Sequence, residues 1–322
     1  MRYLVTGGAG FIGSNLIKTL VYRGDEVTVL DDFSVGKKEY LEDSLDNIEV
    51  VEGSVCDFDL MRNLISKTDM VFHLAVKCLV ACNDNPVMAH EVNVGGTFNV
   101  CLAAHEAHAK VVYVSSSEVY GTCKYSPMTE NHPTEPQSIY GLSKLIGEEY
   151  VKHFNKYYGV PAVIIRPFNT YGPNHRDDQY SAVITAFIRR MENGESPIIE
   201  GTGEQSRDFT YISDTVEGIV LLSKLEHGET VNIGSGKAIS IKELAATLMR
   251  IYGVENKPIF TDARPNDVFK LEADIGRAKA YGYEPKVSLE EGLRKYVAWW
   301  KQKDGLTYEE LWQNCEHGER TQ

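Results

Sequence analysis

Tyr140 and Lys144 are the side chains whose types and spacing best suit acid–base chemistry. They lie four residues apart in the run Tyr-Gly-Leu-Ser-Lys, and this spacing puts two side chains on one face of a helix. A free tyrosine has a pKa of about 10 and is a poor base at neutral pH. Because a nearby ammonium group favours the phenolate, the pair predicts a tyrosine whose pKa is lowered for taking a proton.

A serine-rich loop is the second chemical feature. The run Ser-Ser-Ser-Glu-Val-Tyr-Gly occupies 115–121, directly after an apolar segment at 111–115 that predicts a strand. The carboxyl ends of parallel strands face the ligand crevice of such a sheet. We therefore expect the hydroxyl of Ser116 to bind the same substrate oxygen as Tyr140.

A glycine-rich turn indicates the cofactor. Gly7, Gly10 and Gly13 stand three residues apart, between a strand-like run at 2–6 and a helical pattern at 12–23. Such glycines let the backbone approach a pyrophosphate, which then lies at the N-terminus of the helix. Asp31 follows Gly13 by 18 residues and ends the next strand, where a carboxylate accepts ribose hydroxyls and repels a ribose phosphate. The pattern predicts NAD rather than NADP.

The segments that must position these residues alternate between strand and helix. Strand-like runs lie at 2–6, 26–30, 48–51, 70–75, 111–115 and 161–166. Helical patterns lie between them at 12–23, 57–66, 86–108 and 138–158. Continuous apolar strands alternating with helices predict an α/β fold, a Rossmann-type doubly wound parallel sheet covered on both faces.

The pattern changes after Asn169, where prolines interrupt it. A helix is predicted at 208–225, a strand at 230–233, and further helices near 240–252 and 288–301. We expect an NAD-binding Rossmann domain made of 1–170 plus about 206–235. A smaller C-terminal α+β domain, made of 171–205 plus 236–318, is expected to bind the substrate.

Composition excludes several other classes. The net charge of −13 over 322 residues disfavours nucleic acid and anionic membranes as partners, and we expect neither. No secretory signal or apolar run of membrane-spanning length is visible, and six cysteines are too few for a disulfide scaffold, so a cytoplasmic enzyme is expected. Cys78 and Cys82 lack a second Cys/His pair at ligand spacing, and no metal site is predicted.

The motifs together resemble the extended short-chain dehydrogenase/reductase family, in its NAD-dependent sugar-nucleotide epimerase/dehydratase branch, which includes UDP-glucose 4-epimerase. The resemblance extends over roughly residues 1–300. It rests on TGGAGFIGS at 6–14, LDDFS at 30–34, HLA at 73–75, NVGGT at 93–97, SSSEVYG at 115–121, YGLSK at 140–144, RPFNTYGP at 166–173, GEQSRDFTYISD at 203–214 and ARPNDV at 263–268.

The resemblance implies roles for individual residues. Tyr140 is expected to be the catalytic base, with Lys144, Ser116 and Glu118 as the other catalytic residues. The expected cofactor-binding residues are Gly7, Gly10, Phe11, Ile12, Gly13, Asp31, Asp32, Leu74, Ala75, Lys77, Asn93, Ser115, Tyr140, Lys144 and Pro167. The expected residues for a nucleotide-diphosphate sugar are Lys77, Ser116, Ser117, Asn169, Arg207, Tyr211, Arg264 and Asp267. A homodimer formed through the helices at 86–108 and 138–158 is also implied.

Three reactions of the branch remain open, and Glu118 bears on the choice. A carboxylate at this position resembles the second base of the 4,6-dehydratases, which removes the C5 proton of the sugar. Alternatively, Glu118 only orients the loop. The dehydratases tend to carry Thr-Asp-Glu where this chain has Ser116, Ser117 and Glu118, and the UDP-glucuronate decarboxylases carry an arginine where Leu271 stands. We therefore rank 4-epimerase first, 4,6-dehydratase second and decarboxylase third. A non-catalytic NAD-binding protein is disfavoured because Tyr140 and Lys144 are present.

Overall fold

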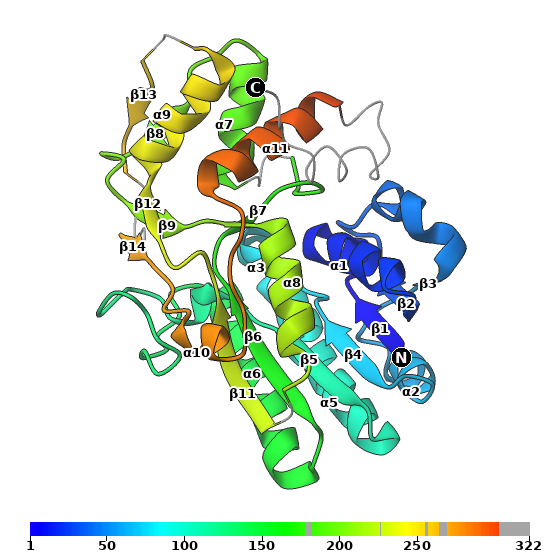
Figure 1. Cartoon of the computed structure of the whole chain (residues 1–322). Coiled ribbons are helices and arrows are strands. Elements are labelled where there is room, and N and C mark those ends of the chain that lie inside the picture. Colours follow the sequence, from blue (N-terminus) through cyan, green and yellow to red (C-terminus); the bar gives the residue numbers. More distant parts are fainter. Residues whose placement is uncertain (178–181, 226, 255–256, 264–268, 303–322) are drawn as a thin grey trace.

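A seven-stranded parallel sheet forms the centre of the molecule (Figure 1). The structure is a computed structural model that describes residues 1–177, 182–225, 227–254, 257–263 and 269–302. The strand order is β11-β6-β5-β4-β1-β2-β3, so the direction of winding reverses between β1 and β4. This order confirms the predicted Rossmann-type doubly wound fold, which binds ligands beside that reversal. The strands are β1 (Arg2–Thr6), β2 (Glu26–Asp31), β3 (Ile48–Glu52), β4 (Met70–His73), β5 (Lys110–Val114), β6 (Ala162–Pro167) and β11 (His227–Ile233).

Apolar side chains leave both faces of this sheet. Successive residues of a strand point to opposite faces, and the two faces need separate cores. On β1, Tyr3 and Val5 pack in one core and Leu4 in the other. On β5, Val112 and Val111 are divided in the same way. The near-continuous apolar strands of the sequence follow from this two-sided burial.

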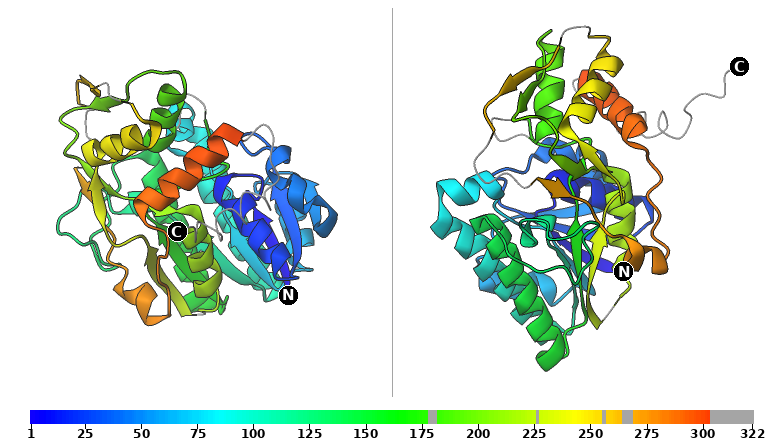
Figure 2. Two further views of the ribbon diagram at one scale, coloured as in Figure 1. Left: turned by 45° about the horizontal axis from the view of Figure 1, so that its top comes forward. Right: turned by 90° about the vertical axis from the view of Figure 1, so that its left-hand side faces the viewer.

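Helices cover the two faces of the sheet (Figure 2). α1 (Phe11–Tyr22) and α8 (Ile212–Leu222) pack in one core, and α2 (Phe58–Ile65), α5 (Gly96–Ala107) and α6 (Ile139–Tyr158) in the other. The ends of α6 are set by local sequence. The Ser138 hydroxyl accepts the Gly141 N–H at 3.0 Å at its start, and Gly159 ends it in the left-handed conformation (φ 69°). The other elements of this part are η1 (Lys38–Asn47), α3 (Leu79–Asp84), α4 (Pro86–Ala89), η2 (His90–Gly95) and η3 (Ser117–Val119).

A second group of elements lies beyond the carboxyl edge of the large sheet, in the upper part of Figure 1. Its strands form the sheets β12-β9-β14, β13-β8 and β10-β7. They are β7 (Thr170–Tyr171), β8 (Ile198–Glu200), β9 (Ser206–Asp208), β10 (Thr210–Tyr211), β12 (Ala238–Ser240), β13 (Ile259–Thr261) and β14 (Lys270–Leu271). Its helices are α7 (Val183–Glu192), α9 (Ile241–Tyr252) and α11 (Leu289–Gln302), and α10 (Gly276–Ala280) packs against β11.

Two predicted helices differ from the observed elements. Residues 208–211 are mainly extended, and α8 begins only at Ile212. The Asp208 carboxylate explains this, because it accepts the N–H groups of Ser235 (2.8 Å) and Gly236 (2.9 Å) and so joins separate segments. The predicted helix at 86–108 consists of α4, the wide π turn η2 and α5.

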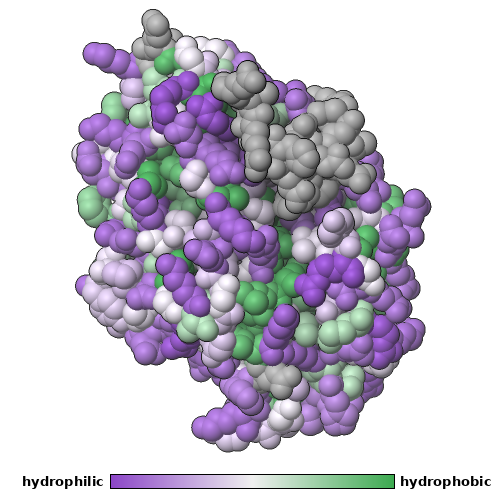
Figure 3. All heavy atoms as spheres, viewed as in Figure 1, coloured by the Kyte–Doolittle hydropathy of each residue, from purple (hydrophilic) through white to green (hydrophobic). Residues whose placement is uncertain are grey.

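Figure 3 shows the face of the molecule that Figure 1 presents, and this face is mostly hydrophilic, with hydrophobic side chains gathered around α8. Val220 and Leu221 of α8 are half-buried there. Among the described residues, no helix is long and apolar enough to cross a membrane.

Candidate functional site

The glycine-rich turn between β1 and α1 has the shape that a dinucleotide diphosphate needs. Gly7 has φ 68°, and a Cβ atom there would lie 2.7 Å from the backbone nitrogen of Ala75. A Cβ atom on Gly13 would overlap the carbonyl oxygen of Gly7. Gly10 precedes α1 without a side-chain cap, so the N–H groups of the first helical turn stay available to an anion. The turn therefore fits NAD, and side chains at these glycines would close it.

Asp31 ends β2 and braces this turn. Its carboxylate accepts the N–H groups of Ala9 and Phe33, each at 2.9 Å. Burial raises the pKa of Asp31, although these two N–H groups oppose the rise. Each carboxylate oxygen keeps acceptor capacity, so Asp31 can brace the turn and still receive a ribose hydroxyl.

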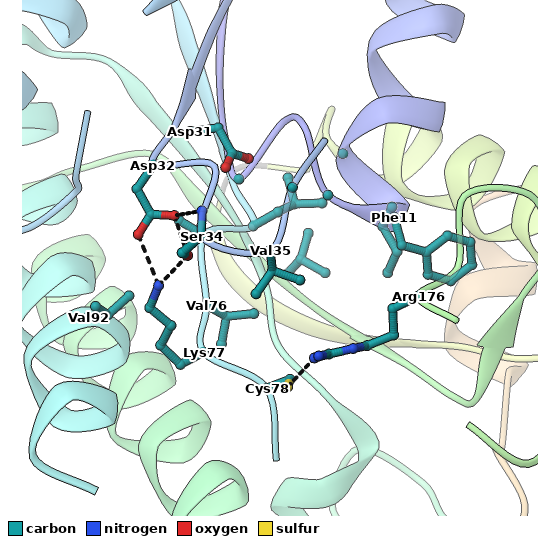
Figure 4. A pocket seen from close by; sticks show the side chains of 18 of the residues that line it. Phe11, Asp31, Asp32, Ser34, Val35, Val76, Lys77, Cys78, Val92 and Arg176 are labelled. Atoms are coloured by element: carbon teal, nitrogen blue, oxygen red, sulfur yellow. Dashed lines mark hydrogen bonds and ion pairs between the residues drawn. The ribbon is translucent and has the colours of Figure 1, made fainter. Parts of the chain in front are cut away.

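Lys77 points toward Asp32 and Ser34 across the cleft (Figure 4). Its Nζ lies 2.9 Å from Oδ2 of Asp32 and 2.5 Å from Oγ of Ser34. Although burial opposes it, the hydrogen bonds from Ser34 and Lys77 lower the pKa of Asp32. The sequence predicted cofactor and substrate contacts for Lys77, and in the structure its ammonium group bonds Asp32 and Ser34.

Tyr140 and Ser116 meet at the far end of this cleft. Burial raises the pKa of Tyr140, a hydrogen bond with Ser116 opposes the rise, and the carboxylate of Glu118 adds to it. The predicted lowering of this pKa is therefore not produced by the side chains around Tyr140. The predicted closeness of Ser116 and Tyr140 is present, and Glu118 lies near them.

Lys144 lies one helical turn after Tyr140 and is only 2% exposed. Its Nζ stands 4.2 Å from the ring centre of Tyr113, a cation–π distance. Burial lowers the pKa of Lys144 to about 7, although Glu148 opposes the fall.

A buried ion pair supports the serine loop and α6 from below. Glu148 of α6 accepts Arg166 Nε at 2.8 Å and Nη2 at 2.5 Å, and the Ser115 hydroxyl at 2.6 Å. Glu148 is fully buried and Arg166 is 3% exposed. The pair joins β6, the end of β5 and the helix that carries Tyr140 and Lys144, so it fixes their relative positions.

Asn169 has two features typical of a ligand-binding residue. Its backbone has φ 22°, and its Nδ2 is buried without a hydrogen-bond partner. Among the described residues, the only other buried side-chain polar atoms without a partner belong to Asp25 and Thr210. The Thr210 N–H donates to the carbonyl oxygen of Asn169 at 3.3 Å, so these two residues, each with an unpaired side-chain atom, are neighbours in space. The Asn169 amide is therefore a buried donor that a ligand can use.

Most of the predicted cofactor residues line this cleft. Thirteen of the fifteen do so, namely Gly7, Gly10, Phe11, Ile12, Gly13, Asp31, Asp32, Leu74, Ala75, Lys77, Ser115, Tyr140 and Lys144. Asn93 lies behind the cleft, because its side chain bonds the backbone N–H and carbonyl of Lys77 at 2.7 and 3.1 Å. Pro167 is buried and pairs with Ile233 in the sheet. Neither residue is among those that line the cleft, and their cofactor contacts stay predictions.

The predicted substrate residues are more scattered. Ser117 is 4% exposed, and Tyr211 is 4% exposed with its ring 5.6 Å from that of Tyr171. Arg207 is half-buried on β9, where its strand neighbour on β14 is Leu271. Arg264 and Asp267 lie outside the described residues. Of the three that the structure describes, only Arg207 combines a positive charge with partial exposure.

Several parts of the lining were missed by the sequence prediction, and one of them comes from a distant part of the chain. Asn174, His175, Arg176 and Asp177 line the cofactor cleft, although they follow β7 in the second group of elements. The prolines and polar residues there predicted only an interruption. No spacing rule links this stretch to α1, and the structure alone brings them together.

Comparisons with known proteins agree with this geometry. The model of the NAD dependent epimerase/dehydratase family matches residues 3–234. A putative UDP-glucose 4-epimerase of Methanocaldococcus jannaschii is 36% identical over 302 residues, which cover 92% of this chain and 98% of the relative. A UDP-N-acetyl-alpha-D-glucosaminuronate decarboxylase of Bacillus cytotoxicus is 34% identical, with 94% of this chain and 98% of the relative covered. The UDP-glucose 4-epimerase of Thermotoga maritima, solved with UDP-glucose, matches with a TM-score of 0.90 at 34% identity, covering 94% of this chain and 99% of that one.

Proposed function

Since the chain belongs to the NAD-dependent epimerase/dehydratase family, we propose that it is a nucleotide-sugar 4-epimerase with Tyr140 as its base. NAD is the cofactor, and the family acts on nucleotide sugars through epimerase, dehydratase or decarboxylase reactions. The observation that carries the proposal is the meeting of Tyr140 with Ser116 above the buried Lys144. A 4-epimerase needs this set and no second base.

The side chains have separate tasks in this reaction. Ser116 and Tyr140 bind the oxygen at C4 of the sugar, and Tyr140 takes its proton as the hydride leaves C4, which gives a transient 4-keto sugar. Return of the hydride to the opposite face of C4, with the proton returned from Tyr140 to the oxygen, would then give the epimer. Lys144 stabilises the phenolate through its charge. Bound NAD supplies the hydride acceptor, and its positive nicotinamide ring also favours the phenolate. Asn169 and Arg207 are proposed to bind the nucleotide diphosphate, since an acidic chain needs local donors for an anionic substrate.

A 4,6-dehydratase is the second candidate, because Glu118 lies close enough to raise the pKa of Tyr140. Its carboxylate would remove the C5 proton. Against it, Ser117 is buried and offers no carboxylic acid to the leaving hydroxyl. A decarboxylase is ranked below both, since Leu271 is 2% exposed and carries no charge for a substrate carboxylate.

A panel of UDP-, dTDP-, GDP- and CDP-sugars tests the proposal. Product NMR is expected to detect a C4 epimer from at least one of them. Glu118→Gln is expected to retain most of the epimerase activity, with Tyr140→Phe as the inactive control. Loss of turnover in Glu118→Gln together with a 4-keto-6-deoxy product would replace the proposal by the dehydratase.

We also propose a homodimer formed through α5 and α6. A groove between these helices is lined by Phe98, Leu102, Ile146, Glu149, Tyr150, His153, Phe154 and Tyr158. Phe98 is 37% exposed and Tyr158 is 49% exposed. Burying such a surface between two copies would remove large apolar groups from water, and a C2 dimer would use the same groove on both copies.

A further inference from the structure

Lys77 links the two strand ends that flank the glycine-rich turn. It follows β4, and its partners Asp32 and Ser34 follow β2. In the sheet, β4 and β2 are the two neighbours of β1. The bridge therefore crosses over the end of β1, where the turn for the NAD diphosphate begins. Lys77 is 7% exposed, whereas the Asp32 side chain is 39% exposed, so the lysine end of this ion pair is the shielded one.

The next residue, Cys78, forms a second bridge across the same cleft (Figure 4). Its Sγ accepts Nη1 of Arg176 at 2.8 Å, and 98 positions separate the two residues in the chain. Arg176 belongs to the segment 173–177, which we call the strap. Both bridges thus end on one short loop, at Lys77 and Cys78.

The strap is fixed on α1, the helix whose N-terminus faces the cofactor. The carbonyl oxygen of Pro173 accepts Asn15 Nδ2 at 3.1 Å, and Asn174 Nδ2 donates to the Ser14 hydroxyl at 3.0 Å. The rings of His175 and Phe11 lie 4.4 Å apart. With these contacts at one wall and Arg176 at the other, the strap spans the cleft.

The loop that receives both bridges is itself held firmly. The Asn93 side chain bonds both backbone groups of Lys77, and its Nδ2 also donates to the Ser143 hydroxyl at 2.9 Å. Ser143 precedes Lys144 on α6. The bridges therefore end on a fixed support beside the reacting end of the cleft, rather than on a freely moving loop.

We propose that the Lys77–Asp32 and Arg176–Cys78 contacts are two clasps that retain NAD in the cleft between turnovers. A dinucleotide lying between these walls has to break at least one clasp to leave. The proposal depends on NAD as the cofactor and is independent of which family reaction the chain performs. Its failure would therefore leave the 4-epimerase proposal intact, and the reverse also holds.

The rate of NAD release tests the clasps. Protein loaded with NAD is mixed with an excess of a dehydrogenase that reduces the free cofactor, and the appearance of NADH is followed. Cys78→Ala, which removes one charge-assisted hydrogen bond, is expected to release NAD about tenfold faster, and Lys77→Met, which removes the bonds to Asp32 and Ser34, at least as fast as that. Cys78→Ser, whose hydroxyl still accepts the guanidinium, is expected to stay near the wild-type rate.

Two matched variants serve as controls. Cys123→Ala removes another free thiol outside the cleft lining. Lys18→Met removes a lysine whose Nζ lies 2.9 Å from Asp43 with nearly the same exposure as Lys77, 10% against 8% for the side chains. Both are expected to release NAD at the wild-type rate.

Arg176→Met removes the other partner of the Arg176–Cys78 clasp. In a double-mutant cycle, adding Cys78→Ala to Arg176→Met should not accelerate NAD release further, because the first substitution has already removed this contact. Release rates within twofold of wild type in Cys78→Ala and Lys77→Met would overturn the proposal. So would a Cys78→Ser variant as fast as Cys78→Ala.

Discussion

Arg166→Met is expected to destabilise the protein strongly, because it leaves the buried Glu148 carboxylate with only the more distant Lys152 Nζ, at 3.6 Å, as a counter-charge. Methionine keeps much of the length and apolar volume of the arginine stem, so the main loss is the charge and its hydrogen bonds. Arg166 is 3% exposed, Glu148 is fully buried, and two hydrogen bonds of 2.8 and 2.5 Å join them. Removing one partner of such a pair costs about 3–5 kcal/mol. Against a total stability of about 5–15 kcal/mol, this loss is large.

Urea unfolding followed by circular dichroism measures the effect as a change in the free energy of unfolding. Arg62→Met is the matched control, because Arg62 also forms two hydrogen bonds to one carboxylate, Glu106, at 2.7 and 2.9 Å. That pair is exposed, with side chains 54% and 36% accessible, so water replaces it at little cost. The control is expected to unfold close to wild type.

A double variant separates charge burial from packing. Replacing Arg166 and Glu148 together by methionine removes the uncompensated charge and is expected to recover part of the stability lost in Arg166→Met. Equal destabilisation by Arg166→Met and Arg62→Met would refute the reasoning. A double variant less stable than Arg166→Met would show that the pair matters for packing rather than for charge.

Four further outcomes are expected. Tyr140→Phe should keep NAD bound and lose turnover by about 100-fold or more in a product assay, and normal turnover would contradict its role as the base. Asp31→Ala should lower the NAD content of the purified protein, and unchanged occupancy would contradict its ribose contact. The pKa of Lys144 is about 7 in the folded protein, below its unfolded value of 10.5. Between these two pH values the folded protein binds fewer protons than the unfolded chain, so the free energy of unfolding is expected to rise with pH across this window. Lys144→Met should remove this rise, and an unchanged slope would argue against the lowered pKa. Phe98→Glu should convert the dimer to a monomer in light scattering, and a monomeric wild type would refute the dimer.

The fold was predictable because its strands are buried on both faces. The strand-like runs at 26–30 and 161–166 lie within the observed strands β2 and β6 except for Pro161. The glycine turn was predictable for a related reason, since Gly7 and Gly13 occupy positions where a Cβ atom has no room. A local sequence pattern is enough to predict a feature when the residues that determine it all lie in one segment.

The less predictable features depend on contacts between distant segments. The extended conformation at 208–211 follows from N–H groups that Ser235 and Gly236 bring to Asp208, and no local pattern encodes this. The strap at 173–177 lines the cofactor cleft only because it meets α1, some 160 positions earlier in the chain. Burial raises the pKa of Tyr140 in the protein alone, and the spacing of Tyr140 and Lys144 gave no sign of this burial.

Product analysis in D2O is the most direct test of the proposed 4-epimerase reaction. The protein is incubated with UDP-glucose and with the other nucleotide sugars of the panel, and the products are identified by proton NMR. The account predicts a C4 epimer that keeps its proton at C5, because Tyr140 acts only on the C4 hydroxyl. A 4-keto-6-deoxy sugar, a pentose formed by loss of carbon dioxide, or an epimer carrying deuterium at C5 would contradict it.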